Sequence, residues 1–308
     1  MILLYGLMED PPLAKVHHYL KCWQEPVLFV NQRTFFDYKF HIHETLSEST
    51  ISHEAHTYKL SDFTSAYFRP ENLEAIPELL PYQENQEVWL SAITFDSTLW
   101  QWSETTPSLN MVNRASAMAS NQSKPFQAEI IRKSGFSIPE TLITTSPNAV
   151  EVFLKKHKRI IYKSISGIRS IVSEVGEEHL TRLASIVNCP TQFQAYVPGI
   201  DYRVHVLGDK LFACKIQSVQ ADYRYDQQSD IENVTLPPLI HQKCLTLSAQ
   251  LGLSLSGIDL RQTPDNEWLC FEVNTSPGYS FFEQAAGQTI SYHLADYLTK
   301  PFLNPSLS

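Results

Sequence analysis

The sequence predicts an α/β domain at the N-terminus, followed by a longer region of helices and antiparallel hairpins. A strand, a helix and a second strand open the chain over residues 2–30, which indicates a parallel sheet with a right-handed crossover. Two hairpin patterns lie in the second half, around Gly208-Asp209 and around Asp265-Asn266. The 308 residues are enough for two or three domains with a sizeable buried core.

The composition narrows the class of protein. A hydrophobic content of 43% is typical of a globular chain, and the net charge of −9 predicts no basic surface for nucleic acid. The five cysteines show no CxxC spacing, which favours reduced thiols in a cytoplasm. No apolar run approaches the roughly 20 residues that span a membrane. Met1–Tyr5 is expected to be a buried strand rather than part of a signal peptide.

The first 110 residues contain the elements of the α/β domain. A helix with apolar residues at helical spacing follows the first strand, and a long amphipathic helix is expected over Tyr82–Trp102. The absence of a GxGxxG pattern argues against a dinucleotide-binding domain. Residues 40–58 carry four histidines, for which solvated strands or loops are favoured over a metal site. The expected strands are Ile2–Leu7, Pro26–Val30 and Ala66–Phe68.

The middle of the chain alternates helices and strands. Asn121–Ser134 is predicted to be a helix that Gly135 ends. Lys124 lies in its first turn, where the lysine and the helix dipole would both favour a phosphate, although a solvent-facing lysine is the alternative. Further strands are expected at residues 138–144, 159–165 and 191–198, and further helices at residues 147–156, 236–252 and 290–298. In the helix over 236–252, the leucines Leu239, Leu245 and Leu251 are expected in the core.

The hairpin over Asp201–Gln217 admits two registers. A two-residue loop pairs Leu207 with Lys210 and makes Arg203 face Cys214. A three-residue loop makes Arg203 face Lys215 instead, which would bring two cations together. The residues themselves leave both registers open.

The second hairpin gathers oxygen ligands. If Asp265-Asn266 is a two-residue loop, Asp259 faces Glu272, and Glu272 shares a face with Asn274. Two carboxylates and an amide oxygen suit Mg²⁺. The alternative is a half-exposed sheet with ordinary acids. The apolar neighbours of Glu272 favour a site, because an unpaired acid among them would be costly.

The letters GIDL and FEVNTSPG in this hairpin resemble the C-terminal signature of ATP-grasp enzymes, above all RimK-type ligases and the ligases that cross-link graspetides (microviridin-type peptides). The resemblance extends over Met111–Leu298. It implies an α/β N-terminal domain over residues 1–110, followed by an α+β ATP-grasp fold with subdomains at 111–194 and 195–308. It also implies that the Tyr82–Trp102 helix packs against the central subdomain.

The resemblance assigns roles to individual residues. The family's Mg²⁺ ligands match Asp259, Glu272 and Asn274. A flexible loop over Ser164–Ser170, with Gly167, would close over the phosphates of ATP. Arg203 and Arg224 would face the transferred phosphate, and a loop salt bridge is the alternative for Arg224. The remaining ATP contacts implied are Lys124, Lys163 and Lys215, the backbone of Gln194, Tyr196 and Val197 at the adenine, and Asp201 at the ribose.

The implied chemistry is phosphorylation of a carboxylate by ATP, followed by capture of the acyl phosphate by an amine or a hydroxyl. The first hypothesis is a ligase that acts on a small molecule. The second is a graspetide-type ligase that forms lactam or lactone bonds in a peptide. The third is a nucleotide-binding module without activity, against which the complete set of Asp259, Glu272 and Asn274 argues. The sequence leaves open which carboxylate and acceptor are used and whether the chain forms a homo-oligomer.

Overall fold

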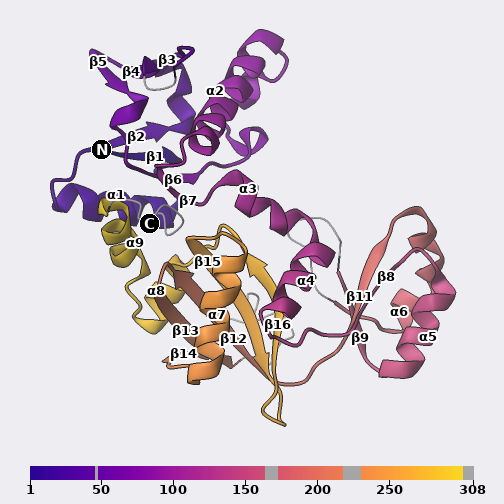
Figure 1. Cartoon of the computed structure of the whole chain (residues 1–308). Helices are drawn as coiled ribbons and strands as arrows, with labels where there is room; N and C mark the ends of the chain where they lie inside the picture. The colour runs from indigo at the N-terminus through magenta and orange to yellow at the C-terminus, as the bar shows by residue number, and fades with distance from the viewer. Residues whose placement is uncertain (46–47, 164–172, 218–229, 301–308) are drawn as a thin grey trace. The chain divides into compact units, whose positions relative to one another are not determined.

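The computed structural model describes residues 1–45, 48–163, 173–217 and 230–300, drawn in colour in Figure 1. The chain divides into two compact units. Unit 1 contains Met1–Met118, Gly278–Glu283 and the stretch from Thr289 onward. Unit 2 contains Ala119–Pro277 and Gln284–Gln288. Unit 1 thus extends past the expected boundary at residue 110 and regains residues from the C-terminal part of the chain.

Unit 1 is built on a parallel sheet with the strand order β2-β1-β6-β7. The expected β-α-β opening is confirmed, because helix α1 (Pro11–Cys22) joins β1 to β2. Asp10 caps this helix by accepting a hydrogen bond from the Leu13 N–H. Every residue of β1 is buried, as expected for a central parallel strand. The strands are β1 (Ile2–Gly6), β2 (Val27–Asn31), β6 (Ser65–Arg69) and β7 (Asn110–Val112).

Helix α2 (Gln86–Thr105) belongs to the core of unit 1. Its buried residues Phe95, Leu99 and Trp102 pack with side chains of the parallel sheet. The buried side of α2 is thus accounted for within unit 1, and packing of this helix against the central subdomain stays a prediction. The apolar stripe of α2 has its partner within unit 1.

A small antiparallel sheet carries most of the histidine-rich segment. Its strands are β3 (Tyr38–His41), β4 (Thr50–His53) and β5 (His56–Lys59). His53 stacks on Tyr38 with ring centroids 4.3 Å apart. Within the described ranges, no three His, Cys, Asp or Glu side chains lie so that they could hold a metal ion. The segment therefore forms strands, one of the two conformations expected for it.

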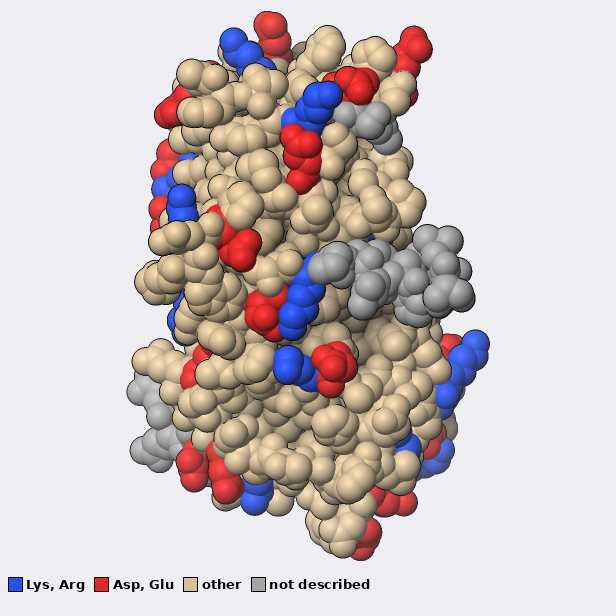
Figure 2. Space-filling model, turned by 60° about the vertical axis from the view of Figure 1, so that its left-hand side comes forward, with Lys and Arg blue, Asp and Glu red and all other residues tan. Residues whose placement is uncertain are grey.

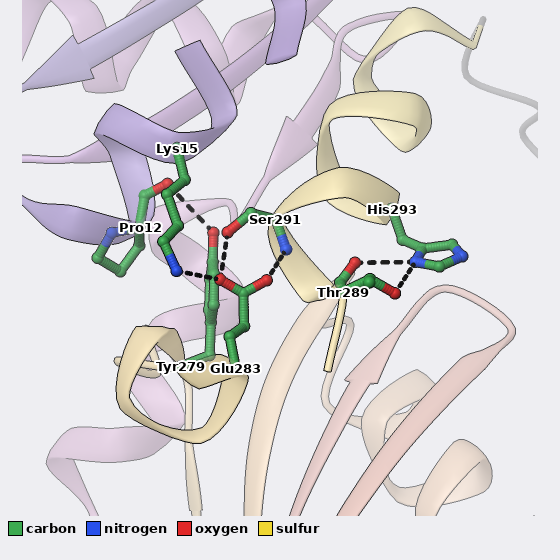
Figure 3. A network of polar contacts seen from close by, with 7 residues as sticks. All are labelled: Pro12, Lys15, Tyr279, Glu283, Thr289, Ser291 and His293. Atoms are coloured by element: carbon green, nitrogen blue, oxygen red, sulfur yellow. Dashed lines mark hydrogen bonds and ion pairs between the residues drawn. The ribbon is translucent and has the colours of Figure 1, made fainter. Parts of the chain in front are cut away.

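The C-terminal part of unit 1 is fastened to α1 by the polar network in Figure 3. Glu283 of α8 (Ser280–Ala286) is nearly buried and accepts hydrogen bonds from the Ser291 N–H and hydroxyl. Lys15 completes an ion pair with the same carboxylate at 3.1 Å. The Tyr279 hydroxyl donates to the Pro12 carbonyl at 3.3 Å. These contacts explain why α9 (Ile290–Thr299), although last in the chain, is part of unit 1.

The first part of unit 2 is a four-stranded sheet with the order β10-β9-β11-β8. One face is apolar and packs on α5 (Pro147–His157), whose N-cap is Ser146. Phe193 and Ala195 of β11 lie on this face, so the intervening Gln192 and Gln194 lie on the opposite face. The strands are β8 (Thr141–Thr144), β9 (Ile160–Lys163), β10 (Ser173–Glu174) and β11 (Thr191–Ala195), and two short helices are α3 (Ala115–Met118, in unit 1) and α6 (Glu177–Leu180).

The second part of unit 2 is a five-stranded antiparallel sheet with the order β14-β13-β12-β15-β16. Helix α7 (Pro238–Gln250) contacts β12 and β15, and its buried residues include Ile240, Cys244 and Leu247. Leu239 is 66% exposed, so its expected core position is wrong, because the buried side of α7 is offset by one residue from that leucine. The strands are β12 (Ile200–Leu207), β13 (Lys210–Gln217), β14 (Asp230–Val234), β15 (Leu255–Gln262) and β16 (Trp268–Asn274).

Surface charge is mixed. On the face shown in Figure 2, acidic and basic side chains are interspersed among residues that carry no charge. Five cysteines are present and all are free thiols. No helix within the described part of the chain is long and apolar enough to cross a membrane.

Candidate functional site

The hairpin of β15 and β16 places the expected acids side by side. Asp259 pairs with Glu272, as predicted, and Gly257 pairs with Asn274 two residues further along the strands. The route to this register differs from the prediction. The loop has three residues between Thr263 and Glu267, closed by a Thr263 N–H to Glu267 carbonyl bond, and Asn266 adopts a left-handed conformation with φ of 64°.

A β-bulge restores the register that the longer loop would have shifted. Leu260 pairs with Cys270 while Asp259 pairs with Glu272, so Phe271 is the extra residue. Consecutive strand residues normally point to opposite faces. Here both Phe271 and Glu272 line one pocket, which the bulge makes feasible.

The neighbouring strand β12 adds a cation to the acids. Arg203 pairs directly with Asp259, and its Nη1 donates to Asp259 Oδ1 at 2.6 Å. Of the two registers left open for β12 and β13, the structure has the two-residue loop, with Leu207 opposite Lys210 and Arg203 opposite Cys214. Lys215 pairs with Tyr202 and thus lies on the other face of the sheet from Arg203. The alternative register, which would have paired Arg203 with Lys215, is therefore not the one that the protein adopts.

Helix α4 (Lys124–Lys133) supplies a lysine from a third direction. Lys124 is its first residue, and its Nζ lies 3.5 Å from Glu272 Oε2. Gln127, one turn further on, fastens the helix to the outer edge of β16, where Val273 is buried. Its side-chain amide donates to the Val273 carbonyl at 2.8 Å and accepts from the Val273 N–H at 2.9 Å. The Val273 N–H and carbonyl on this side of β16 are thereby both hydrogen-bonded, as they would be by a neighbouring strand.

These elements line a pocket of about 240 Å³ within unit 2. Lys163 of β9 lies across from Gln192 of β11, and both side chains are largely buried. The side-chain oxygens of Gln192 and Gln194 are buried and have no hydrogen-bond partner among the described residues. The pocket is lined by Lys124, Pro125, Gln127, Ala128, Glu129, Ile131, Arg132, Ile138, Thr141, Ile143, Lys163, Gln192, Gln194, Phe271 and Glu272.

Some of these pocket residues were missed in the sequence. Gln192 was not singled out, and Gln194 was considered only for its backbone. The alternation of glutamines with Phe193 and Ala195 in TQFQA is a period-2 pattern that indicates one polar and one apolar face. The sequence pattern gave no indication of a pocket role for Arg132, Glu129 or Phe271. Their place at the pocket depends on tertiary packing and on the bulge.

Electrostatics in the site are governed by burial and by close charges. Burial raises the pKa of Glu272, but Lys163, Lys124 and Arg203 outweigh it, so the net pKa is lower than usual. For Asp259, burial and the charge of Glu272 raise the pKa above its usual value despite Arg203. Burial lowers the pKa of Lys163, which Glu272 opposes. Two adjacent, partly exposed carboxylates repel each other, and this repulsion is what a bound cation would remove.

The donor set fits a hard divalent cation. Asp259 and Glu272 offer carboxylate oxygens, and Asn274 offers an amide oxygen that already accepts a hydrogen bond from the Ser276 N–H at 3.0 Å. One or two carboxylates together with phosphate oxygens are the usual ligands of Mg²⁺. The site residues therefore fit Mg²⁺ held together with a phosphate-bearing ligand.

Three residues expected at the adenine and the ribose already have hydrogen-bond partners within the protein. Asp201 forms a bidentate ion pair with Arg261, at 2.7 and 2.8 Å, and Arg261 also donates to the Val197 carbonyl. The Tyr196 N–H donates to the Arg159 carbonyl, so that group is already used within the protein. Gly167 and Arg224 lie outside the described residues.

Together, the fold and the site define a class: an α+β domain in which two lysines and Glu272 line a pocket, beside the Asp259–Arg203 pair, and these groups suit a metal-bound phosphate. Residues 119–298 match the family described as the RimK-like ATP-grasp domain. This match covers more than half of the chain, and the chain therefore belongs to the RimK-like ATP-grasp ligases, an enzyme family. The resemblance found in the sequence is confirmed.

Relatives in sequence and in structure agree with this family. The chain is 22% identical over 253 residues to a probable alpha-L-glutamate ligase of Pseudoalteromonas translucida, which covers 78% of this chain and 82% of the relative. A probable alpha-L-glutamate ligase of Shewanella loihica is 24% identical over 204 residues, 61% of this chain and 67% of the relative.

Solved structures are similar over nearly the whole length. The ATP-grasp ligase PsnB, complexed with a phosphomimetic variant of a minimal precursor, Mg and ADP, has a TM-score of 0.81 at 22% identity and 97% coverage of both chains. The macrocyclase MdnC of Microcystis aeruginosa MRC, bound with the precursor peptide MdnA, has a TM-score of 0.82 at 21% identity, covering 97% of this chain and 99% of that one. At this identity the likeness concerns the fold, and the expected α/β domain followed by an ATP-grasp fold is confirmed.

Proposed function

We propose that this protein uses ATP and Mg²⁺ to join a carboxylate to an amine or a hydroxyl. The observation that carries the proposal is the gathering of three cations around the Asp259–Glu272 pair. Lys124 and Lys163 line the pocket together with Glu272, and Arg203 forms an ion pair with Asp259 beside it. In the first step a carboxylate oxygen of the substrate takes the γ-phosphoryl group of ATP, which gives an acyl phosphate and ADP. In the second step the acceptor attacks the acyl carbon, and inorganic phosphate leaves.

The side chains act on charge and position rather than as nucleophiles. Lys124 and Lys163 bind phosphate oxygens, and Arg203 neutralises charge that develops on the transferred group. Asp259, Glu272 and Asn274 hold Mg²⁺, which when bound neutralises phosphate oxygens. Arg224 remains a proposed partner of the same phosphoryl group. Adenine contacts by the backbone around Gln194 to Val197, a ribose contact by Asp201 and phosphate contacts by the Gly167 loop complete the proposed ATP site. Lys215 is left out, since its strand face differs from that of Arg203.

A peptide substrate is the second candidate, and the whole-length structural likeness favours it. The similar structures include ligases whose names record bound precursor peptides, and they cover the N-terminal as well as the ATP-grasp part of this chain. The sequence relatives, named as glutamate ligases, favour a small acceptor instead. A lactam or lactone cross-link within a peptide would use the same two chemical steps.

Thermal unfolding with and without nucleotide tests the ATP site. A ligand at a hundredfold excess over its Kd stabilises the native state by about 2.7 kcal/mol, so Mg-ATP should raise the Tm. ATP with EDTA should raise it less, because the metal ligands then repel the phosphates. An unchanged Tm at millimolar Mg-ATP would contradict the proposal. Incubation with a precursor peptide encoded beside the gene, followed by mass spectrometry for the loss of one water per bond, separates the two substrate classes.

A further inference from the structure

A buried histidine stands beside Arg203 on the same face of the sheet. His205 follows Arg203 by two residues on β12, so both side chains point to the site face. His205 is fully buried, and Arg203 is only 6% exposed. The proposed chemistry assigns no role to this histidine.

The histidine is an acceptor for the guanidinium group. Arg203 Nε donates to His205 Nε2 at 3.4 Å, while Arg203 Nη1 donates to Asp259 Oδ1 at 2.6 Å. Because Nε2 accepts, the neutral ring carries its proton on Nδ1. Burial lowers the pKa of His205 well below its usual value, and the charge of Arg203 lowers it further. The ring is thereby kept in the form that attracts a guanidinium rather than repelling it.

Gly257 leaves room for the guanidinium on a third side. It pairs with His205 on β12 and with Asn274 on β16. A Cβ atom at this position would lie 2.6 Å from Arg203 Nη2 and 2.8 Å from Pro277 Cβ, well inside contact distance. The guanidinium therefore lies over bare backbone, with His205 and Asp259 as acceptors for two of its nitrogens.

We propose that His205 is a positioning residue, which together with Gly257 holds the Arg203 guanidinium against Asp259 and aims it at the phosphoryl group. The inference rests on the proposed function, in which Arg203 neutralises charge in the transition state. A displacement of a charged group by about 1 Å costs on the order of a hundredfold in rate, so an acceptor that fixes the guanidinium affects turnover without touching substrate.

Two variants of His205 distinguish a role in positioning the Arg203 guanidinium from a role in packing alone. His205→Leu removes the acceptor, whereas His205→Gln keeps one. The first measurement is water exchange of the Arg203 Nε–H by ¹⁵N NMR, with the signal assigned through its loss in Arg203→Lys. Exchange should be about tenfold faster in His205→Leu and close to wild type in His205→Gln, because a hydrogen-bonded, buried N–H is protected.

The second measurement is hydrolysis of Mg-ATP in the absence of an acceptor substrate. His205→Leu should lower kcat by about ten- to a hundredfold with KM for Mg-ATP within about threefold, and His205→Gln should recover most of the loss. Val204→Ala is the matched control, since Val204 is buried on the opposite face of β12. It should lower the Tm and leave the Arg203 signal and kcat unchanged.

Gly257→Ala tests the same arrangement without altering the histidine. Its added methyl group should displace the guanidinium and reproduce both effects of His205→Leu, and it carries the test if His205→Leu fails to fold. Wild-type exchange and kcat in His205→Leu, or equal losses in the Leu and Gln variants, would overturn the inference. A wild-type protein that binds no Mg-ATP would overturn the proposed function instead, while the NMR measurement would still decide whether His205 holds Arg203.

Discussion

Glu272 is a proposed Mg²⁺ ligand and is also in contact with a lysine. Its carboxylate faces Asp259 across the hairpin and lies 3.5 Å from the Lys124 ammonium group. Glu272→Gln keeps the size of the side chain and removes one negative charge. We expect kcat for ATP consumption to fall by about a hundredfold or more, with the Tm changed by only a few degrees, because a metal ligand is weakened but the strand is not.

The control for this variant lies on the same hairpin. Glu267→Gln changes an exposed acid at the loop end of β16 and should leave ADP release unaffected. ADP release is measured against Mg²⁺ concentration for both variants. Wild-type turnover in Glu272→Gln at low Mg²⁺ would remove Glu272 from the metal site.

Asp96 gives a second prediction at the residue scale, in unit 1. Its carboxylate accepts a hydrogen bond from the buried Tyr5 hydroxyl at 2.8 Å. Burial raises the pKa of Asp96 above its usual value of 3.8, against the hydrogen bonds from Tyr5 and Trp100. The folded state therefore holds a proton more tightly than the unfolded state does, and stability falls as pH rises from about 3.8 through the folded pKa.

Asp96→Asn removes this penalty and keeps an acceptor for Tyr5. At pH 7 the variant should be more stable to urea than the wild type, by about 1 kcal/mol or less because Asp96 is only partly buried. Below pH 3.8 the advantage should vanish, since the wild-type carboxyl is then protonated in both states. A variant that is less stable at pH 7 would show that the ionised carboxylate is favoured by the fold.

At the scale of elements, the link between α4 and β16 fixes the relation between Lys124 and Glu272. Gln127 satisfies both the N–H and the carbonyl of Val273 on the open edge of the sheet. Gln127→Met keeps the volume and leaves both backbone groups buried without these partners. Each loss costs about 1–3 kcal/mol, so we expect the free energy of unfolding in urea to fall by roughly 2–6 kcal/mol. Mg-ATP affinity should fall as well, whereas the exposed Gln122→Met should change neither quantity.

Elements also show what the sequence could and could not predict. The partnership of Asp259 with Glu272 was predicted from a two-residue loop, and it holds because the bulge at Phe271 offsets the three-residue loop that the structure has. The three-residue loop and the bulge at Phe271 were not predictable, because two local irregularities that cancel leave no trace in a polarity pattern. Arg203 could not be placed opposite Cys214 or Lys215 from polarity, since both registers leave plausible neighbours and only the loop geometry decides.

At the scale of the whole molecule, the sequence predicted the order of the elements but not the return of the chain to unit 1. The pattern of α9 shows an amphipathic helix, and nothing in that pattern names the partner of its apolar side. Its residues Ile290, Leu294 and Leu298 are fully buried, and α9 contacts α1 and β6. Full burial of each such side chain contributes about 1.5–3 kcal/mol, so these three together contribute roughly 5–9 kcal/mol.

That contribution is comparable with the whole stability of an ordinary domain, about 5–15 kcal/mol. We therefore expect a fragment of residues 1–118 to lack a cooperative thermal transition by near-UV circular dichroism. Adding a peptide of residues 278–300 should restore one, because it supplies α9 together with the Tyr279 and Glu283 contacts to α1 (Figure 3).

A peptide carrying Leu294→Asp is the matched control for this complementation. It keeps the polar network but brings an unpaired charge to a fully buried position, and it should fail to restore the transition. A peptide carrying Glu283→Ala should bind more weakly, because the Ser291 N–H and hydroxyl lose their acceptor while the apolar side remains. Cooperative unfolding of residues 1–118 alone, at the temperature of the full chain, would show that the parallel sheet, α1 and α2 suffice and that α9 only covers them.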